Sequence, residues 1–122
     1  MVRMMLSFEY TPEFTKDLKT LKKRWRSLPS DVVLAESALR VVYADNDEIY
    51  RQFFASKRAT VITKAADFEV VKMRIDCKSL GNDKKTRVIF IAIRTENKIK
   101  LIQLYAKNSN EREDTSRIKR YL

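Results

Sequence analysis

Within Val70–Ser79, which reads VVKMRIDCKS, apolar and polar residues alternate one by one from position 71 to position 78. Positions 71, 73, 75 and 77 are apolar, whereas the positions between them hold Lys72, Arg74 and Asp76, and Lys78 follows the last of them. A β-strand turns successive side chains to opposite faces, so this pattern predicts a half-buried strand. One face is expected to join a core, and the other presents a row of cations with a carboxylate among them.

Three further stretches are expected to join this strand in a sheet. Thr86–Arg94 (TRVIFIAIR) is apolar on both faces after Arg87, which is typical of a central strand. Ile99–Lys107 (IKLIQLYAK) follows the sequence TENK, which favours a hairpin turn. Near the N-terminus, Leu6–Thr11 (LSFEYT) alternates over a shorter length and predicts a short strand.

The spacing of apolar residues between these strands predicts two helices. Thr11 and Pro12 supply an N-cap hydroxyl and a first-turn proline, and apolar residues recur at positions 14, 18, 21 and 25. This helix is expected to run through Trp25 and to end before Pro29. A second helix, capped by Ser30, is expected from apolar residues at 32, 35, 39 and 42. Joined by a short turn, the two helices form a helical hairpin.

Two segments remain. Residues 44–67 show no clear period and are expected to form an irregular or partly helical insertion, in which Phe53 and Phe54 suit a short helix and TVIT a strand fragment. The C-terminal NSNEREDTSRIKRYL predicts a short helix capped by Asn110, with Glu113 three residues later. Acidic residues begin this segment and basic residues end it, which complements the helix dipole.

The order of these elements predicts an α+β fold in a single domain over residues 1–122. The expected sheet is small and antiparallel, and consists of the short N-terminal strand and a three-stranded C-terminal meander. The helical hairpin covers one face of this sheet, and the short C-terminal helix follows the last strand.

The charge of the chain is concentrated in the predicted meander. The formal net charge is +10, and residues 68–107 hold ten Lys and Arg against four Asp and Glu. A basic patch confined to one sheet indicates a polyanionic partner, either nucleic acid, an acidic protein or both. The alternative is a basic, solvated surface without a specific ligand.

Composition excludes several classes of protein. The chain has no His and one Cys, so it lacks the usual general base and the standard zinc ligands, and we expect neither a metal nor a small-molecule cofactor. With one Gly it has none of the glycine-rich motifs of dinucleotide or P-loop enzymes. No apolar run reaches the roughly 20 residues of a membrane helix, so no membrane association is expected. Without a recognisable signal peptide, a cytoplasmic location is expected.

Three local signatures occur in a familiar order. They are YTPEFTKDLKTLKKRW, then VVKMRI followed by TRVIFIAI, then KLIQLYAKNSNERED followed by RIKRYL. Together they resemble the RelE/ParE/HigB superfamily of type II toxin–antitoxin toxins, nearest its HigB-like or RelE-like branch. Two features depart from the family pattern. NDKKTR stands where the family often has Gly-Gly before the central-strand Arg, and residues 44–67 are longer than the usual link.

The resemblance implies a metal-independent, ribosome-dependent mRNA endonuclease that a cognate antitoxin holds inactive. Its partners would then be the antitoxin, the ribosome and mRNA. ParE-type relatives inhibit DNA gyrase instead, and a non-catalytic RNA-binding or degenerate toxin-like module is a third reading. Carried over by position, the working cations are Lys72, Arg74, Arg87, Lys107 and, approximately, Arg112.

Further RNA contacts are expected from Lys78, Lys84, Lys85, Tyr105 and Tyr121. The terminal Tyr or His that some members of the family use has no clean match, because Tyr121 comes later than expected. The alternative for Tyr121 is packing of the last helix, and the alternative for the turn lysines is general electrostatic attraction.

These residue types suit phosphodiester cleavage by the RNA's own 2′-hydroxyl. An Arg such as Arg74 or Arg87 holds phosphate oxygens bidentately and keeps its charge. A Lys flanked by other cations has a lowered pKa, so Lys72 or Lys107 is a candidate for proton transfer. The alternatives are a solvated face or an antitoxin-only contact for Lys72 and Arg74, and a structural ion pair for Arg87.

Overall fold

The computed structural model describes residues 6–44, 46–78, 86–106 and 112–122. In chain order the elements are β1 (Ser7–Tyr10), α1 (Pro12–Leu21), α2 (Leu28–Val42), α3 (Asp47–Ala55), β2 (Ala59–Lys64), β3 (Phe68–Ile75), β4 (Thr86–Ile93), a 3₁₀ turn (Arg94–Glu96), β5 (Lys98–Ala106) and α4 (Thr115–Arg120). Within these ranges the strands form one five-stranded sheet in the order β1-β5-β4-β3-β2. The predicted α+β class is confirmed.

The sheet differs from the predicted one in two respects. β1 pairs with β5 in parallel, from Ser7 opposite Lys98 to Tyr10 opposite Leu101, whereas the prediction was a wholly antiparallel sheet. The parallel pair is allowed because the helices between β1 and the meander supply the long crossover that such a pair requires. The other difference is that β2, which contains the strand fragment predicted at TVIT, joins the sheet at its other edge and pairs antiparallel with β3.

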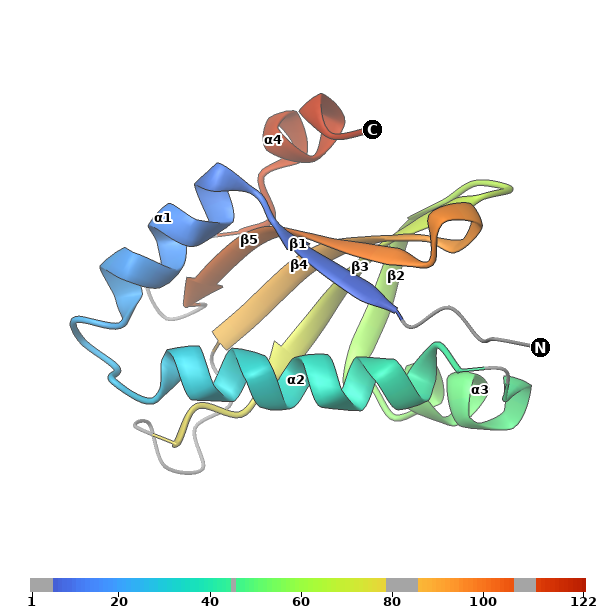
Figure 1. Ribbon diagram of the computed structural model, residues 1–122, viewed down its shortest axis with the longest axis horizontal. Helices are drawn as coiled ribbons and strands as arrows, with labels where there is room; N and C mark the ends of the chain where they lie inside the picture. Colours follow the sequence, from blue (N-terminus) through green and yellow to red (C-terminus); the bar gives the residue numbers. More distant parts are fainter. Residues whose placement is uncertain (1–5, 45, 79–85, 107–111) are drawn as a thin grey trace.

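The helices divide between the two faces of the sheet (Figure 1). The larger core lies under α1 and α2, where Phe14, Leu28 and Leu39 pack on side chains of the central strands. A smaller core lies on the opposite face under α4, where Ile118 packs on Ile89 and other strand residues. The central strand β4 is therefore covered on both faces, as its continuous apolar sequence predicted.

The first two helices differ from the predicted boundaries. α1 ends at Leu21, and Trp25 lies in the following turn with its amide donating to the Leu21 carbonyl at 2.9 Å. Trp25 is nevertheless buried in the larger core. α2 begins at Leu28 with Pro29 in its first turn, so Ser30 is not the cap. A proline is tolerated there because the first amides of a helix have no intrahelical partner.

The last helix begins later than predicted. Its N-cap is Asp114, whose carboxylate accepts a hydrogen bond from the Arg117 amide at 3.0 Å. Glu113 therefore precedes the helix and leaves its side chain available to the sheet face. The predicted cap, Asn110, lies outside the described residues.

The alternation predicted along β3 is confirmed. Val71, Met73, Ile75 and Cys77 are each no more than 3% exposed and belong to the larger core. The neighbouring Lys72 is half-buried and Arg74 is exposed, on the face that carries α4.

Candidate nucleic-acid interface

The cations of the sheet line up across three strands as well as along β3. In the register of the sheet, Arg74 on β3 is opposite Arg87 on β4, and Arg87 is opposite Tyr105 on β5. At the other side of β3, Lys72 is opposite Thr60 on β2. Like charges directly opposite one another destabilise a sheet. An arginine pair in this position therefore favours an anion bound between or above the two guanidinium groups.

Arg87 is the most buried of these cations, with 7% of its surface exposed. Its Nη1 donates a hydrogen bond to the Thr86 carbonyl at 3.1 Å. Burial lowers the pKa of Arg87, the charge of Arg74 lowers this pKa further, and Tyr105 opposes both effects. An arginine remains charged at neutral pH despite such a shift. The site thus holds a desolvated positive charge, whose field is less screened than that of a surface residue.

A shallow hollow of about 160 Å³ collects these side chains. Of the residues that the structure describes, those lining it are Lys57, Arg58, Thr60, Lys72, Arg74 and Arg87. The two cations from the turn between α3 and β2, Lys57 and Arg58, were not predicted as site residues. Their signal in the sequence is a basic pair, SKRAT, directly before a β-branched stretch. The pair was missed because residues 44–67 show no period that would place β2 beside β3.

Lys72 is paired with a carboxylate. Its Nζ lies 3.5 Å from Oε2 of Glu113, and both side chains are about one-third exposed, at 34% and 31%. A backbone hydrogen bond lowers the pKa of Glu113, and the positive charges of Lys72 and Arg112 lower it further, against an opposing effect of burial. Glu113 is therefore ionised at neutral pH. The sequence placed Arg74 next to Lys72 on the same face of the strand and gave no indication of this anion.

Of the other predicted residues that the structure describes, none lines this hollow. Arg112 is exposed, and its carbonyl accepts a hydrogen bond from Nε2 of Gln103 at 2.9 Å. Lys78 lies beyond the end of β3, and its amide donates to Oδ2 of Asp31 on α2 at 3.3 Å, so Lys78 does not continue the strand's row of cations. The predicted residues Lys84, Lys85 and Lys107 lie outside the described residues.

The two candidate tyrosines lie in packed positions. Tyr105 is 3% exposed and belongs to the smaller core with Ile118, so its ring would have to be uncovered before it could stack on a base. Burial raises the pKa of Tyr105, the charge of Glu113 raises it further, and Arg87 opposes the shift. The hydroxyl of Tyr121 donates to Oε1 of Glu13 on α1 at 2.9 Å. In the described conformation, Tyr121 therefore fastens α4 to α1.

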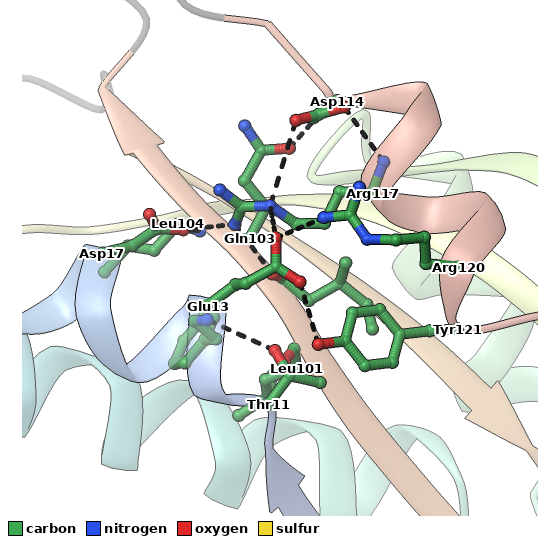
Figure 2. A network of polar contacts seen from close by, with 12 residues as sticks. Thr11, Glu13, Asp17, Leu101, Gln103, Leu104, Asp114, Arg117, Arg120 and Tyr121 are labelled. Atoms are coloured by element: carbon green, nitrogen blue, oxygen red, sulfur yellow. Dashed lines mark hydrogen bonds and ion pairs between the residues drawn. The ribbon is translucent and has the colours of Figure 1, made fainter.

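A polar network holds α4 against α1 and β5 (Figure 2). Arg117 is at its centre, with Nη1 donating to Oδ2 of Asp17 at 2.7 Å and to the Ile102 carbonyl at 3.0 Å. Gln103 adds a second link, because its Oε1 accepts the Asp114 amide at 2.7 Å. Arg117, expected to serve the helix dipole, thus bridges three elements. The network fixes the chain just before α4, where Glu113 meets Lys72.

The described part of the chain holds no group of three or more His, Cys, Asp and Glu side chains placed to bind a metal ion. Among its helices, none has the length and apolar character needed to cross a membrane.

The protein therefore has an α+β fold, and one face of its sheet carries a cation-lined hollow. No protein-family model matches the sequence, and no curated protein matches it significantly. The structure is similar to a chain of the crystal structure of the archaeal RelE–RelB complex from Pyrococcus horikoshii OT3, with a TM-score of 0.56 and 17% sequence identity. The similarity covers 85% of this chain and 97% of that chain. It confirms the predicted RelE-like fold, and the HigB-like branch stays a prediction.

Proposed function

We propose that this protein is the toxin of a type II toxin–antitoxin system and that it acts as a metal-independent, ribosome-dependent mRNA endonuclease. The observation that carries the proposal is the hollow in which Lys72, Arg74 and Arg87 converge with two further cations on the face of a RelE-like sheet. An inhibitor of DNA gyrase has no need of a phosphate clamp, so this hollow favours the nuclease over the gyrase inhibitor. A non-catalytic RNA-binding module remains the outcome if cleavage is absent.

The reaction requires one bond to form and one to break. The 2′-oxygen of the RNA attacks the adjacent phosphorus and the bond to the 5′-oxygen breaks, which gives a 2′,3′-cyclic phosphate and a 5′-hydroxyl end. Negative charge builds up on the non-bridging oxygens as this happens. In the proposed mechanism Arg74 and Arg87 hold those oxygens, which their positions opposite one another in the sheet support. Preorganised charge of this kind is usually the largest contribution to catalysis.

The Lys72–Glu113 pair supplies a proton donor and an acceptor beside the two arginines. In the proposed mechanism the ionised Glu113 takes the proton of the 2′-hydroxyl, and the Lys72 ammonium donates a proton to the leaving 5′-oxygen. Glu113 is a weak base because its pKa is lowered, so the arginines must supply most of the rate. Arg112, adjacent to Glu113 in the sequence, and Lys107, six residues before it, are proposed to contact flanking phosphate.

A cognate antitoxin is part of the proposal. The similar archaeal structure is that of a RelE–RelB complex, which supports a partner of the RelB kind for this chain. The antitoxin is expected to order a segment on binding and to place anionic or helical surface over Lys72, Arg74 and Arg87. Expression of the protein alone is then harmful, and coexpression of the antitoxin restores growth.

The test is induced expression of the protein alone, followed by mapping of mRNA 5′ ends. Cuts inside translated codons support the nuclease, and their disappearance when translation is blocked supports ribosome dependence. Intact mRNA together with DNA damage would indicate that the protein inhibits DNA gyrase instead. Normal growth of cells that contain folded protein would contradict both toxin readings. The matched control is an Arg87→Ala variant expressed to the same level.

A further inference from the structure

The turn between α3 and β2 brings a second group of cations to the sheet face. Lys57, at the turn, has a φ of 64°, a left-handed conformation that costs a residue with a Cβ roughly 1–2 kcal/mol. The next residue is fixed to β3, because the Arg58 carbonyl accepts the Arg74 amide at 2.8 Å. The turn is therefore a continuation of the β2–β3 ladder, and it holds two basic side chains beside Arg74.

A hollow of about 210 Å³ lies at this turn, lined by Ser56, Lys57, Arg58 and Arg74. Lys57, Arg58 and Arg74 also line the first hollow, so the two are adjacent and share a wall. Every side chain lining the second hollow is charged or carries a hydroxyl group. It offers hydrogen-bond donors to an anion and no apolar side chain that would anchor a peptide.

The cations of the second hollow are available to a ligand. In the described ranges no carboxylate lies within ion-pair distance of the Lys57 ammonium. Arg58 Nη2 lies 3.0 Å from Oδ2 of Asp76, but these side chains are 46% and 54% exposed. An ion pair this exposed contributes little to stability, so a phosphate can take the place of the carboxylate at small cost.

We propose that the second hollow binds the backbone phosphate next to the one that is cut, so that a single RNA strand crosses from β4 toward the α3–β2 turn. This inference rests on the proposed function, in which the first hollow holds the scissile phosphate. Lys57 and Arg58 are binding residues in this assignment and take no part in bond breaking. The contact is with backbone phosphate, so it is independent of base sequence.

The expected effect follows from counterion release. On a single strand each neutralised phosphate contributes roughly 0.7 to the slope of log K against log salt concentration. Removing the Lys57 contact should therefore reduce the slope by about 0.7. If the curves of parent and variant meet near 1 M salt, the loss of affinity is about eightfold at 50 mM and about threefold at 200 mM.

The probe is a short, unstructured RNA with 2′-O-methyl groups, which binds but cannot be cut because it lacks the attacking hydroxyl. Dissociation constants are measured from 50 to 200 mM salt, concentrations at which phosphate contacts dominate affinity. The variants are Lys57→Gln, which removes the charge but keeps a polar side chain, and the control Lys64→Gln, which removes an exposed charge at the far end of β2, where Lys64 lines neither hollow. Poly-glutamate is titrated in parallel as an acidic polypeptide.

The expected result is the reduced slope for Lys57→Gln and a much smaller change for Lys64→Gln. Equal effects of the two substitutions would overturn the subsite, as would a parent protein that does not bind the RNA at 50 mM salt. If Lys57→Gln weakened the binding of poly-glutamate but not of the RNA, the hollow would be assigned to an acidic protein and the RNA assignment would be overturned. Cleavage in cells is scored separately. A different result is that the parent protein binds this RNA with the expected dependence on Lys57 and yet cuts no mRNA. That result would support the second hollow as a phosphate subsite and refute the proposed nuclease activity.

Discussion

Replacing Arg87 with Ala removes a guanidinium that is 7% exposed and is directly opposite Arg74 in the sheet. In the proposed reaction this group meets negative charge as it develops on the phosphate. Two unit charges about 4 Å apart interact by about 4 kcal/mol at an effective dielectric constant near 20. Loss of one preorganised oxyanion donor costs about 2.7–4 kcal/mol, or a factor of about 10²–10³ in rate. Both routes predict that Arg87→Ala cleaves about 10²–10³ times more slowly.

The assay is mRNA cleavage on translating ribosomes, with thermal unfolding measured on the same preparations. The substitution removes a hydrogen bond from a charged guanidinium to the Thr86 carbonyl, worth about 1.5–3 kcal/mol, but it also relieves the repulsion between Arg87 and Arg74, which offsets part of this loss. The change in stability should therefore be small beside the change in rate. Arg87→Lys should recover part of the activity, because it restores the charge without the bidentate fork. Lys64→Ala, on β2 away from the hollow, serves as the charge control.

A folded Arg87→Ala variant that cleaves as fast as the parent would refute the reasoning. It would mean that Arg87 has a structural role and that the phosphate is held elsewhere. A Lys64→Ala variant as slow as Arg87→Ala would also contradict it, because the effect would then follow net charge and not position.

Three further expectations concern packing and buried charge on the two faces of the sheet. Arg94→Ala should lower the free energy of unfolding, measured in urea, by about 1.5–3 kcal/mol, because the fully buried Glu69 loses a charged partner at 3.1 Å. An unchanged midpoint of the urea unfolding transition would contradict this. Ile118→Ala should cost about 2–4 kcal/mol and expose Tyr105, which near-ultraviolet circular dichroism would detect. Burial and a hydrogen bond to Glu69 raise the pKa of Tyr50 to about 12 from 10.0. As the pH rises, the unfolded chain therefore loses the hydroxyl proton of Tyr50 before the folded chain does. The contribution of Tyr50 to stability should be present below pH 10 and be lost between pH 10 and 12, as alkaline denaturation measurements would show.

The position of α4 links stability to the candidate site. The helix covers Tyr105 and is held by Arg117, while the residue two places before it, Glu113, pairs with Lys72. A substitution that loosens α4 is therefore expected to alter activity as well as stability. Comparing cleavage rate with unfolding free energy for Ile118→Ala separates these effects from the direct electrostatic effect at Arg87.

Local sequence patterns determined much of the secondary structure of this protein and which of its strand side chains are buried. The alternation along β3 identified which of its side chains are buried and which cations face outward, because a strand's two faces follow from the backbone alone. The Thr11 cap and Pro12 marked the start of α1 for a similarly local reason, since both act on the first turn of the helix. The apolar run of β4 correctly placed that strand at the centre of the sheet.

The tertiary structure alone decided which distant residues meet. Nothing in the sequence placed Arg74 opposite Arg87, because strand register depends on the packing of the whole sheet. The same holds for Lys57 and Arg58, which reach the site because β2 pairs with β3, and for Glu113, which reaches Lys72 because α4 starts at Thr115. Periodicity and caps are properties of neighbours along the chain. An electrostatic site depends on distances between residues far apart in sequence, and those distances exist only once the sheet and its covering helices have packed.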